Sequence, residues 1–192
     1  MHDIQPFHKW RDQYAGEEDA LSPFHGRSYN EEKVIYNYVI HPYWDDFGSE
    51  TLFMKILFAD YETGHAIIEF IGEWNDAIQN DVMLMKRNAI ETLLDEGISH
   101  FVLICENVLN FHASDDCYYE EWAEECRDAF NGGWIAFINT FDHVAQELDS
   151  AGIDNYCYYG HNFNGFTWRI YSPKYIFEWV ESRILESSRK LK

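Results

Sequence analysis

The chain has 192 residues, of which 34 are acidic and 14 are basic, so its formal net charge is −20 at pH 7. This charge argues strongly against duplex DNA and against an anionic membrane surface as main partners, because both are bound by neutralising phosphates. The 46% apolar and 18% aromatic content excludes a disordered acidic tail. No apolar run approaches the ~18 residues of a membrane span, so one ordinary folded domain is expected.

The beginning of the chain and its cysteines predict a reduced, cytoplasmic protein. No basic start followed by an apolar stretch is present, so no signal peptide is expected. Four cysteines occur without any Cys-x-x-Cys pair, and a disulfide framework is not expected without a secretory signal. The nine histidines show neither His-x-x-x-His nor His-Glu-x-x-His spacing, so neither a zinc site nor another cofactor is predicted.

Residues 1–50 are expected to be an N-terminal extension that packs on a single α/β domain formed by residues 51–192. The extension contains three prolines and many scattered aromatic residues, and a strand is predicted only at 34–40. The sequence contains no internal repeat and no low-complexity tract.

The domain begins with a predicted hairpin followed by a long helix. Strands are expected at 52–59 and 66–71, with a turn at 62–64 between them. Apolar residues at helical spacing predict a helix over 75–96, which Gly97 would end. The residues expected to face inward from this helix are Ile78, Val82, Met85, Ala89 and Leu93.

Strands and helices alternate further along the chain. The apolar runs at 101–105 and 134–138 predict strands that are covered on both faces. One helix is expected to start near Ser114. Another is expected to run from Phe141 to Gly152 with Thr140 as its cap, and its inward residues would be Phe141, Val144, Ala145 and Leu148. The apolar stripe of the first of these helices would contain Tyr119, Trp122, Ala123, Cys126 and Phe130.

The C-terminal part is predicted to be a hairpin and a helix. Residues 156–171 are aromatic and β-like, and Asn164-Gly165 is a typical two-residue hairpin turn. Ser172 and Pro173 would open the last helix as its cap and first residue. Repeated strand–helix–strand units imply parallel strands. The expected fold is therefore α/β, with a mixed, mostly parallel sheet and helices packed on it.

Residues 66–160 resemble a STAS domain, the fold of the SpoIIAA anti-sigma-factor antagonists. The resemblance depends on Ile-Ile-Glu-Phe-Ile-Gly-Glu-Trp at 67–74, the helix that follows, the strand at 101–104 and the connector at 106–111. The close of the third helix, Leu-Asp-Ser-Ala-Gly-Ile-Asp at 148–154, is similar to the family's Leu-x-x-Gly-Leu. The resemblance implies a SpoIIAA-like fold over about half of the chain.

The switch motif of that family is degenerate in this chain. The family has Asp-Ser-Ser/Thr-Gly at the start of its second helix, and a kinase phosphorylates the second hydroxyl residue. Here the four aligned positions hold Ala113, Ser114, Asp115 and Asp116, so an aspartate stands at the acceptor position. The resemblance therefore implies the fold without the kinase switch.

Polar residues follow two of the predicted parallel strands and could surround one cleft. Open parallel sheets bind ligands beyond the carboxyl ends of their strands, and a polar ligand or a divalent cation would suit these side chains. Alternatively, Ser114 is a helix cap, and the two aspartates after it complement the helix dipole. The candidate residues are Asn110, His112, Ser114, Asp115, Asp116, Asn139, Thr140 and His143.

The helix after these loops has a charged face formed by Glu120, Glu121, Glu124 and Glu125. This face either docks a basic partner or is an ordinary solvated surface.

Three functions are consistent with the sequence. The first is a non-catalytic protein-interaction or regulatory module with an unknown protein partner. The second is a small-molecule or lipid-binding protein with an apolar pocket between the sheet and the terminal segments. The third is a cation-assisted enzyme that uses the loops at 112–116 and 139–143. No Gly-x-Ser-x-Gly elbow, catalytic cysteine motif or phosphate-binding glycine loop is present, which argues against an enzyme. The three functions are preferred in the order given.

Overall fold

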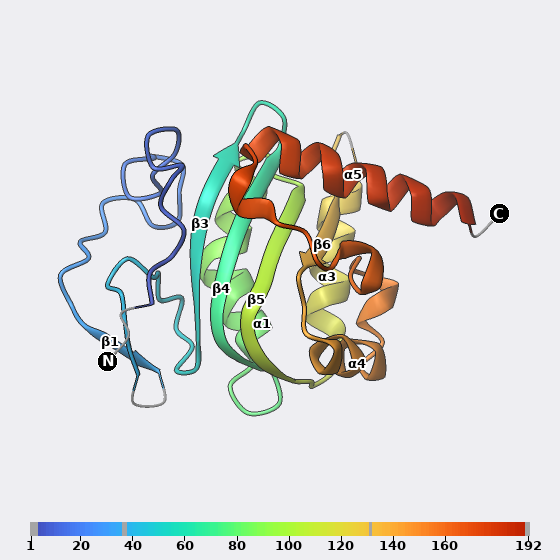
Figure 1. Cartoon of the computed structure of the whole chain (residues 1–192), viewed down its shortest axis with the longest axis horizontal. Helices are drawn as coiled ribbons and strands as arrows, with labels where there is room; N and C mark the ends of the chain where they lie inside the picture. The colour runs from blue at the N-terminus through green and yellow to red at the C-terminus, as the bar shows by residue number, and fades with distance from the viewer. Residues whose placement is uncertain (1–3, 36–37, 131, 191–192) are drawn as a thin grey trace.

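A four-stranded sheet forms the centre of the molecule (Figure 1). In the computed structural model, which describes residues 4–35, 38–130 and 132–190 (side chains of 188–190 excepted), the strand order is β3-β4-β5-β6. The first pair is antiparallel, and β4, β5 and β6 are parallel to one another. The strands are β3 (Leu52–Asp60), β4 (His65–Asn75), β5 (His100–His112) and β6 (Trp134–Ile138). This is the predicted α/β class with a mostly parallel sheet.

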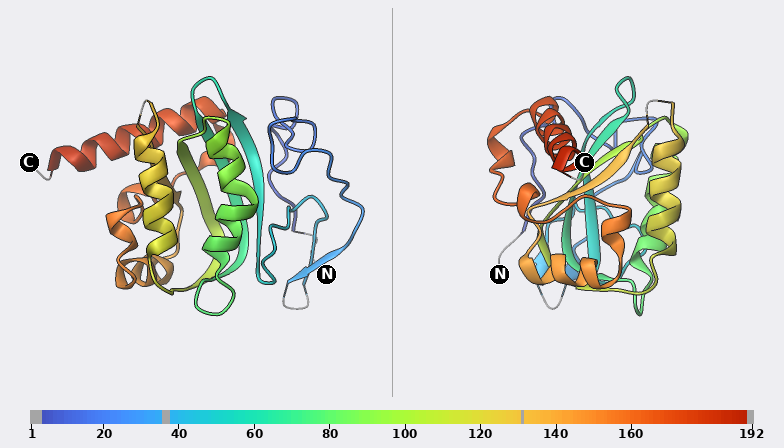
Figure 2. Two further views of the ribbon diagram at one scale, coloured as in Figure 1. Left: turned by 180° about the vertical axis from the view of Figure 1, so that it is seen from behind. Right: turned by 90° about the vertical axis from the view of Figure 1, so that its right-hand side faces the viewer.

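The two faces of the sheet are covered by different helices (Figure 2). One continuous helix, consisting of α1 (Asp81–Met85), a π-helical turn (Lys86–Ile90) and α2 (Glu91–Asp95), packs on one face beside α3 (Cys117–Asp128). The opposite face is covered by α5 (Pro173–Lys190) and the segment before it. Since both faces are covered, the central strands are almost continuously apolar rather than alternating.

The first long helix starts six residues later than predicted, at Asp81. The carboxylate of Asp76 accepts hydrogen bonds from Trp74 Nε1 at 3.1 Å, Val82 N at 2.8 Å and Tyr119 Oη at 2.6 Å. These hydrogen bonds hold the residues before Asp81 in a loop, so Ile78 is 84% exposed instead of facing the core.

β5 is longer than predicted and includes the expected connector at 106–111. Beyond Ile104 it has no β6 neighbour, but it continues to pair with β4 as far as Asn75 and His112. The next helix, α3, starts at Cys117 rather than near Ser114, and its N-cap, Asp116, makes no capping hydrogen bond through its side chain.

Two aromatic residues that were expected to face the core are exposed. α3 ends at Asp128, so Phe130 lies beyond the apolar stripe and is fully exposed. The helix α4 (Asp142–Ser150) has Phe141 as its N-cap instead of Thr140, and Phe141 is 42% exposed. The predicted core-facing residues in the middle of both helices, such as Trp122 and Leu148, are buried.

The predicted C-terminal hairpin is replaced by three short 3-10 helices (Ile153–Asn155, His161–Phe163 and Trp168–Ile170). The side chain of Asn164 bonds to Thr140 and that of Asn139 bonds to Phe166. Tyr158 also makes backbone hydrogen bonds with Ile135 and Phe137 of β6, so the segment is attached to the sheet without forming a hairpin. The last helix, α5, starts at Pro173 as predicted.

The N-terminal part lies along the β3 side of the sheet (Figure 1). It contains the short strands β1 (Lys33–Ile35) and β2 (Tyr38–Ile40), which form an antiparallel pair. Residues 36 and 37 of the predicted strand lie outside the described residues. Among the helices that are described, none has the length and apolar character needed to cross a membrane.

Gly72 of β4 is required by the close approach of the strand to Thr51. Its φ is +123°, and an added Cβ would lie 2.0 Å from the carbonyl oxygen of Thr51. We expect Gly72→Ala to lower the free energy of unfolding by more than the ~1–2 kcal/mol that a positive φ costs an L-residue. The control is Gly26→Ala, where φ is +70° but the space is open. Urea denaturation checks this, and equal losses in both variants would contradict it.

Candidate functional site

Three of the predicted site residues gather around the last residues of β5. Asn110 Nδ2 donates a hydrogen bond to Glu73 Oε1 at 2.8 Å, and His112 Nε2 lies 4.0 Å from Glu73 Oε2. His143 Nε2, from α4, lies 2.7 Å from the carbonyl oxygen of Leu109. The loop after β6 therefore does reach the end of β5 through His143.

Three more of the predicted residues lie immediately before α3. Ser114 and Asp115 are exposed, and Asp116 is half-buried. Asp115 Oδ1 accepts a hydrogen bond from the backbone N–H of Cys117 at 3.3 Å. Hydrogen bonds from Cys117 lower the pKa of Asp115 below its ordinary value. This arrangement stabilises a carboxylate at the start of a helix, where the helix dipole also favours it.

The last two predicted residues, Asn139 and Thr140, line a separate cleft of about 410 Å³. Asn139 has a left-handed backbone with φ +57°, and its side chain exchanges two hydrogen bonds with the backbone of Phe166, at 2.9 and 3.0 Å. None of the other polar residues of this cleft was predicted as a site residue; they are Glu106, Asn164, Thr167 and Arg169.

Behind this cleft, an ion-pair cluster joins the sheet to the C-terminal segment. Arg169 contacts both Glu69, at 3.2 Å, and Glu106. Glu69 is only 1% exposed and also accepts a hydrogen bond from the backbone N–H of Phe7 at 2.8 Å. Burial raises the pKa of Glu69 to about 7, although the bonds to Phe7 and Arg169 oppose that shift. A charged residue inside the apolar run 67–71 was the only sequence signal for this cluster.

The acidic face of α3 is divided into two halves by a buried lysine. Lys86, on the π-helical turn, is fully buried, and its Nζ lies 3.0 Å from Glu121 Oε1 and 2.9 Å from Glu125 Oε2. Although burial opposes it, hydrogen bonds to these carboxylates raise the pKa of Lys86 above its ordinary value. Glu121 and Glu125 therefore attach α3 to the first helix.

The other half of the face, Glu120 and Glu124, is exposed. Neither carboxylate forms an ion pair with any residue in the described part of the chain. The four glutamates predicted as one docking surface thus differ in what they contact, and only the outer pair lacks an ion pair among the described residues.

An apolar pocket of about 320 Å³ lies between the β1–β2 pair and the ends of β4 and β5. Its walls include the buried side chains of Ile35, Ile40 and Ile71. Tyr38 and Leu109, which are 63% and 52% exposed, stand at its opening.

The side chains suited to metal binding are dispersed. Across the ranges that the structure describes, no three His, Cys, Asp or Glu residues are grouped so that they could hold a metal ion.

Two solved structures are similar to this chain. One is the anti-sigma factor antagonist SpoIIAA in its unphosphorylated form, with a TM-score of 0.43 and 11% identity, covering 56% of this chain and 88% of that chain. The other is a protein of Thermotoga maritima assigned as an anti-sigma factor antagonist, with a TM-score of 0.40 and 18% identity, covering 56% and 85%. Both are of the family that the sequence resembles. No family model and no curated protein matches the sequence.

The raised pKa of Glu69 predicts a pH-dependent contribution to stability. The folded state binds the Glu69 proton more tightly than the unfolded state, whose ordinary pKa is 4.5. On account of this group, the free energy of unfolding falls as the pH rises from about 4.5 to about 7 and then levels off. Glu69→Gln removes this titration, so the difference between the unfolding free energies of wild type and variant should decrease over that range by up to about 3 kcal/mol.

Urea denaturation at several pH values measures this difference. Glu178→Gln, which alters an exposed carboxylate on α5, is the control and should show no such trend. A difference for Glu69→Gln that stays constant between pH 4.5 and 7 would contradict the prediction.

Proposed function

We propose that this chain is a non-catalytic, cytoplasmic regulatory module that binds another protein through the outer acidic row of α3, formed by Glu120 and Glu124. The observation that supports this proposal is the division of the acidic face. Lys86 neutralises the inner carboxylates, whereas the outer ones are exposed without an ion pair among the described residues. Regulatory binding of a protein is also the kind of role that the names of the two similar structures describe.

The partner is expected to present lysine or arginine side chains to this row. Like charges one helical turn apart, as in Glu120 and Glu124, repel each other, and a cation placed between them would relieve that repulsion. Complementary charges on two proteins mainly increase the rate at which they associate and the specificity of their binding. Because the row is exposed, the interaction should weaken as the salt concentration rises.

The regulatory switch of the family is not part of this proposal. Asp115 stands where the family has its phosphorylated hydroxyl residue, and the exposed Ser114 precedes it. A phosphate on Ser114 would be placed beside two aspartates and would be repelled by them. Regulation of this module therefore depends on something other than phosphorylation at that position.

Charge reversal on α3 tests the proposal. The wild-type chain should capture its partner from the native lysate at low salt. The double variant Glu120→Lys/Glu124→Lys should capture about tenfold less of that partner, or even less. Its stability should stay within about 0.5 kcal/mol of wild type, because the changed side chains are exposed. Quantitative mass spectrometry of the captured proteins measures the effect.

The control for this test is Glu31→Lys/Glu32→Lys, which makes the same change of charge at exposed residues of the N-terminal part. It should retain the captured proteins. Equal capture by wild type and the α3 variant, or equal loss in both variants, would contradict a specific role of the row.

The apolar pocket supports a second candidate function, the binding of a small apolar molecule. A volume of about 320 Å³ is at the lower end of that of small-molecule sites, which are mainly apolar. The walls provide no charged residue, so a neutral hydrocarbon-like ligand is expected. Eight lining residues are far fewer than the roughly 20–30 that each side of a stable protein interface contributes.

A neutral dye tests this second candidate. N-phenyl-1-naphthylamine should fluoresce in the presence of the wild-type chain, and Leu109→Asp should abolish the signal because it places a charge at the opening of the pocket. Ile170→Asp changes another exposed apolar residue, which is 72% exposed, and should leave the signal unchanged. Equal fluorescence in all three proteins would show that the dye binds elsewhere.

A further inference from the structure

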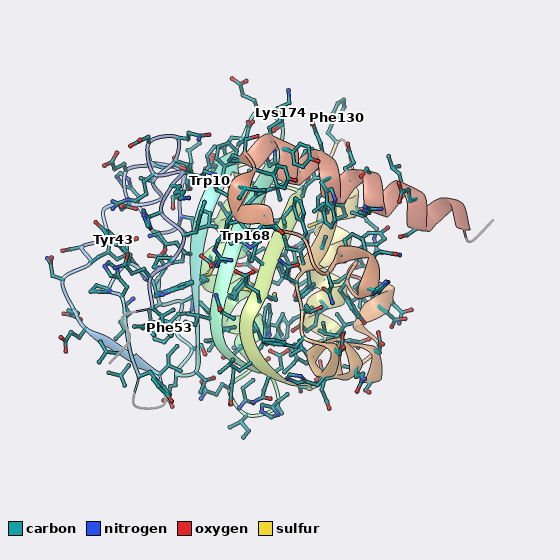
Figure 3. The ribbon with its side chains drawn as sticks, in the orientation of Figure 1. Trp10, Tyr43, Phe53, Phe130, Trp168 and Lys174 are labelled. Carbon is teal, nitrogen blue, oxygen red and sulfur yellow. The ribbon has the colours of Figure 1, made fainter. Side chains whose placement is uncertain are left out.

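A second cavity, of about 230 Å³, lies between the N-terminal segment and the edge strand β3. Side chains from residues 5–17 form one wall and Lys55–Leu57 of β3 form another, and His41 and Tyr43 line the remaining side. Trp10 lies near the sheet and Tyr43 lies farther out in the N-terminal part (Figure 3). Apart from Phe7, whose backbone N–H binds Glu69, none of these residues belongs to the sites described above.

The charged groups at this cavity neutralise one another. Lys55 Nζ lies 3.1 Å from Asp45 Oδ2 and 3.7 Å from Glu17 Oε2, and it donates a hydrogen bond to Tyr29 Oη at 2.8 Å. Arg11 Nη2 donates a hydrogen bond to Glu17 Oε1 at 2.7 Å. Each cation that lines the cavity is therefore already paired, Arg11 with Glu17 and Lys55 with the buried Asp45 behind the wall. Because the charges are paired within the protein, an uncharged ligand suits the cavity best.

One hydrogen-bond acceptor of the cavity has no donor. Glu17 Oε2 is buried and makes no hydrogen bond to any described residue, because 3.7 Å from Lys55 Nζ is too long for one. Buried polar atoms are almost always paired, and an unpaired one is unfavourable. A ligand N–H beside this oxygen would remove the deficiency.

The walls of the cavity are flat and aromatic. Phe7, Trp10, Tyr14 and Tyr43 all line it, and the ring of His41 is stacked on that of Tyr43 with centroids 4.9 Å apart. Such walls favour a planar ring, which stacks on aromatic side chains and loses little freedom when it binds.

We propose that this cavity binds a small, uncharged heterocycle in which a ring N–H lies beside a carbonyl group, as in a pyrimidine base. The ring N–H donates a hydrogen bond to Glu17, and the carbonyl oxygen accepts one from Arg11 or Lys55. This arrangement satisfies the carboxylate oxygen that lacks a donor and keeps the neighbouring charges paired.

Two probes test the proposal on the unaltered full chain; the ring nitrogens carry hydrogen in the first and methyl groups in the second. Uracil should bind in isothermal titration calorimetry and raise the melting temperature saturably. 1,3-Dimethyluracil keeps the ring and both carbonyls but has no N–H, so it should bind at least about tenfold more weakly, since a site built to bond a donor rejects an analogue without it. Absence of uracil binding at millimolar concentration, or equal binding of both probes, would overturn the proposal.

A pair of variants locates the site. Glu17→Gln should weaken uracil binding at least about tenfold, because the amide replaces one carboxylate oxygen by a donor group that repels the ring N–H. Glu18→Gln changes the neighbouring exposed carboxylate and should bind uracil as wild type does. Circular dichroism establishes that both variants are folded. If Glu17→Gln is folded and binds uracil with unchanged affinity, the cavity is not the site.

Discussion

A single buried carboxylate connects both ends of the chain to the middle of the sheet. Glu69, on the central strand β4, accepts one hydrogen bond from the backbone of Phe7 and another from Arg169. Arg169 in turn pairs with Glu106 of the adjacent strand. An ionised carboxylate at 1% exposure is unfavourable unless it is paired. The terminal segments therefore supply the partners that Glu69 needs, and Glu69 determines where they pack.

The order of the strands and helices could be predicted because it depends on local patterns. The periodic spacing of apolar residues and the short apolar runs can be recognised within a few neighbouring residues of the sequence. β6, for example, was predicted with its observed ends. The end of β5 could not be found in this way. Residues 106–112 are polar enough to resemble a connector, but they pair with β4 and therefore continue the strand. Similarly, the first helix begins later than predicted because Asp76 is held in the preceding loop, in part by a hydrogen bond from Tyr119, which is distant in the sequence.

The candidate surfaces show the same dependence on distant residues. Glu120, Glu121, Glu124 and Glu125 are equivalent in the sequence, yet Lys86 binds only two of them. The polar residues at and after the ends of β5 and β6 were identified from topology, whereas Arg169 was not, because it follows no strand and belongs to no motif. Its role became visible only where the C-terminal segment crosses the sheet and meets two carboxylates.

The N-terminal segment links these features physically. Phe7 lines the cavity beside β3, and its backbone is also the hydrogen-bond donor to Glu69. Ile4, a few residues earlier, lines the apolar pocket at the other end of the same segment. A molecule that packs against Phe7 would stabilise the segment on the sheet, and the same contact would favour the position of Ile4. The same short segment thus contributes to both pockets and to the hydrogen bond that attaches it to the sheet.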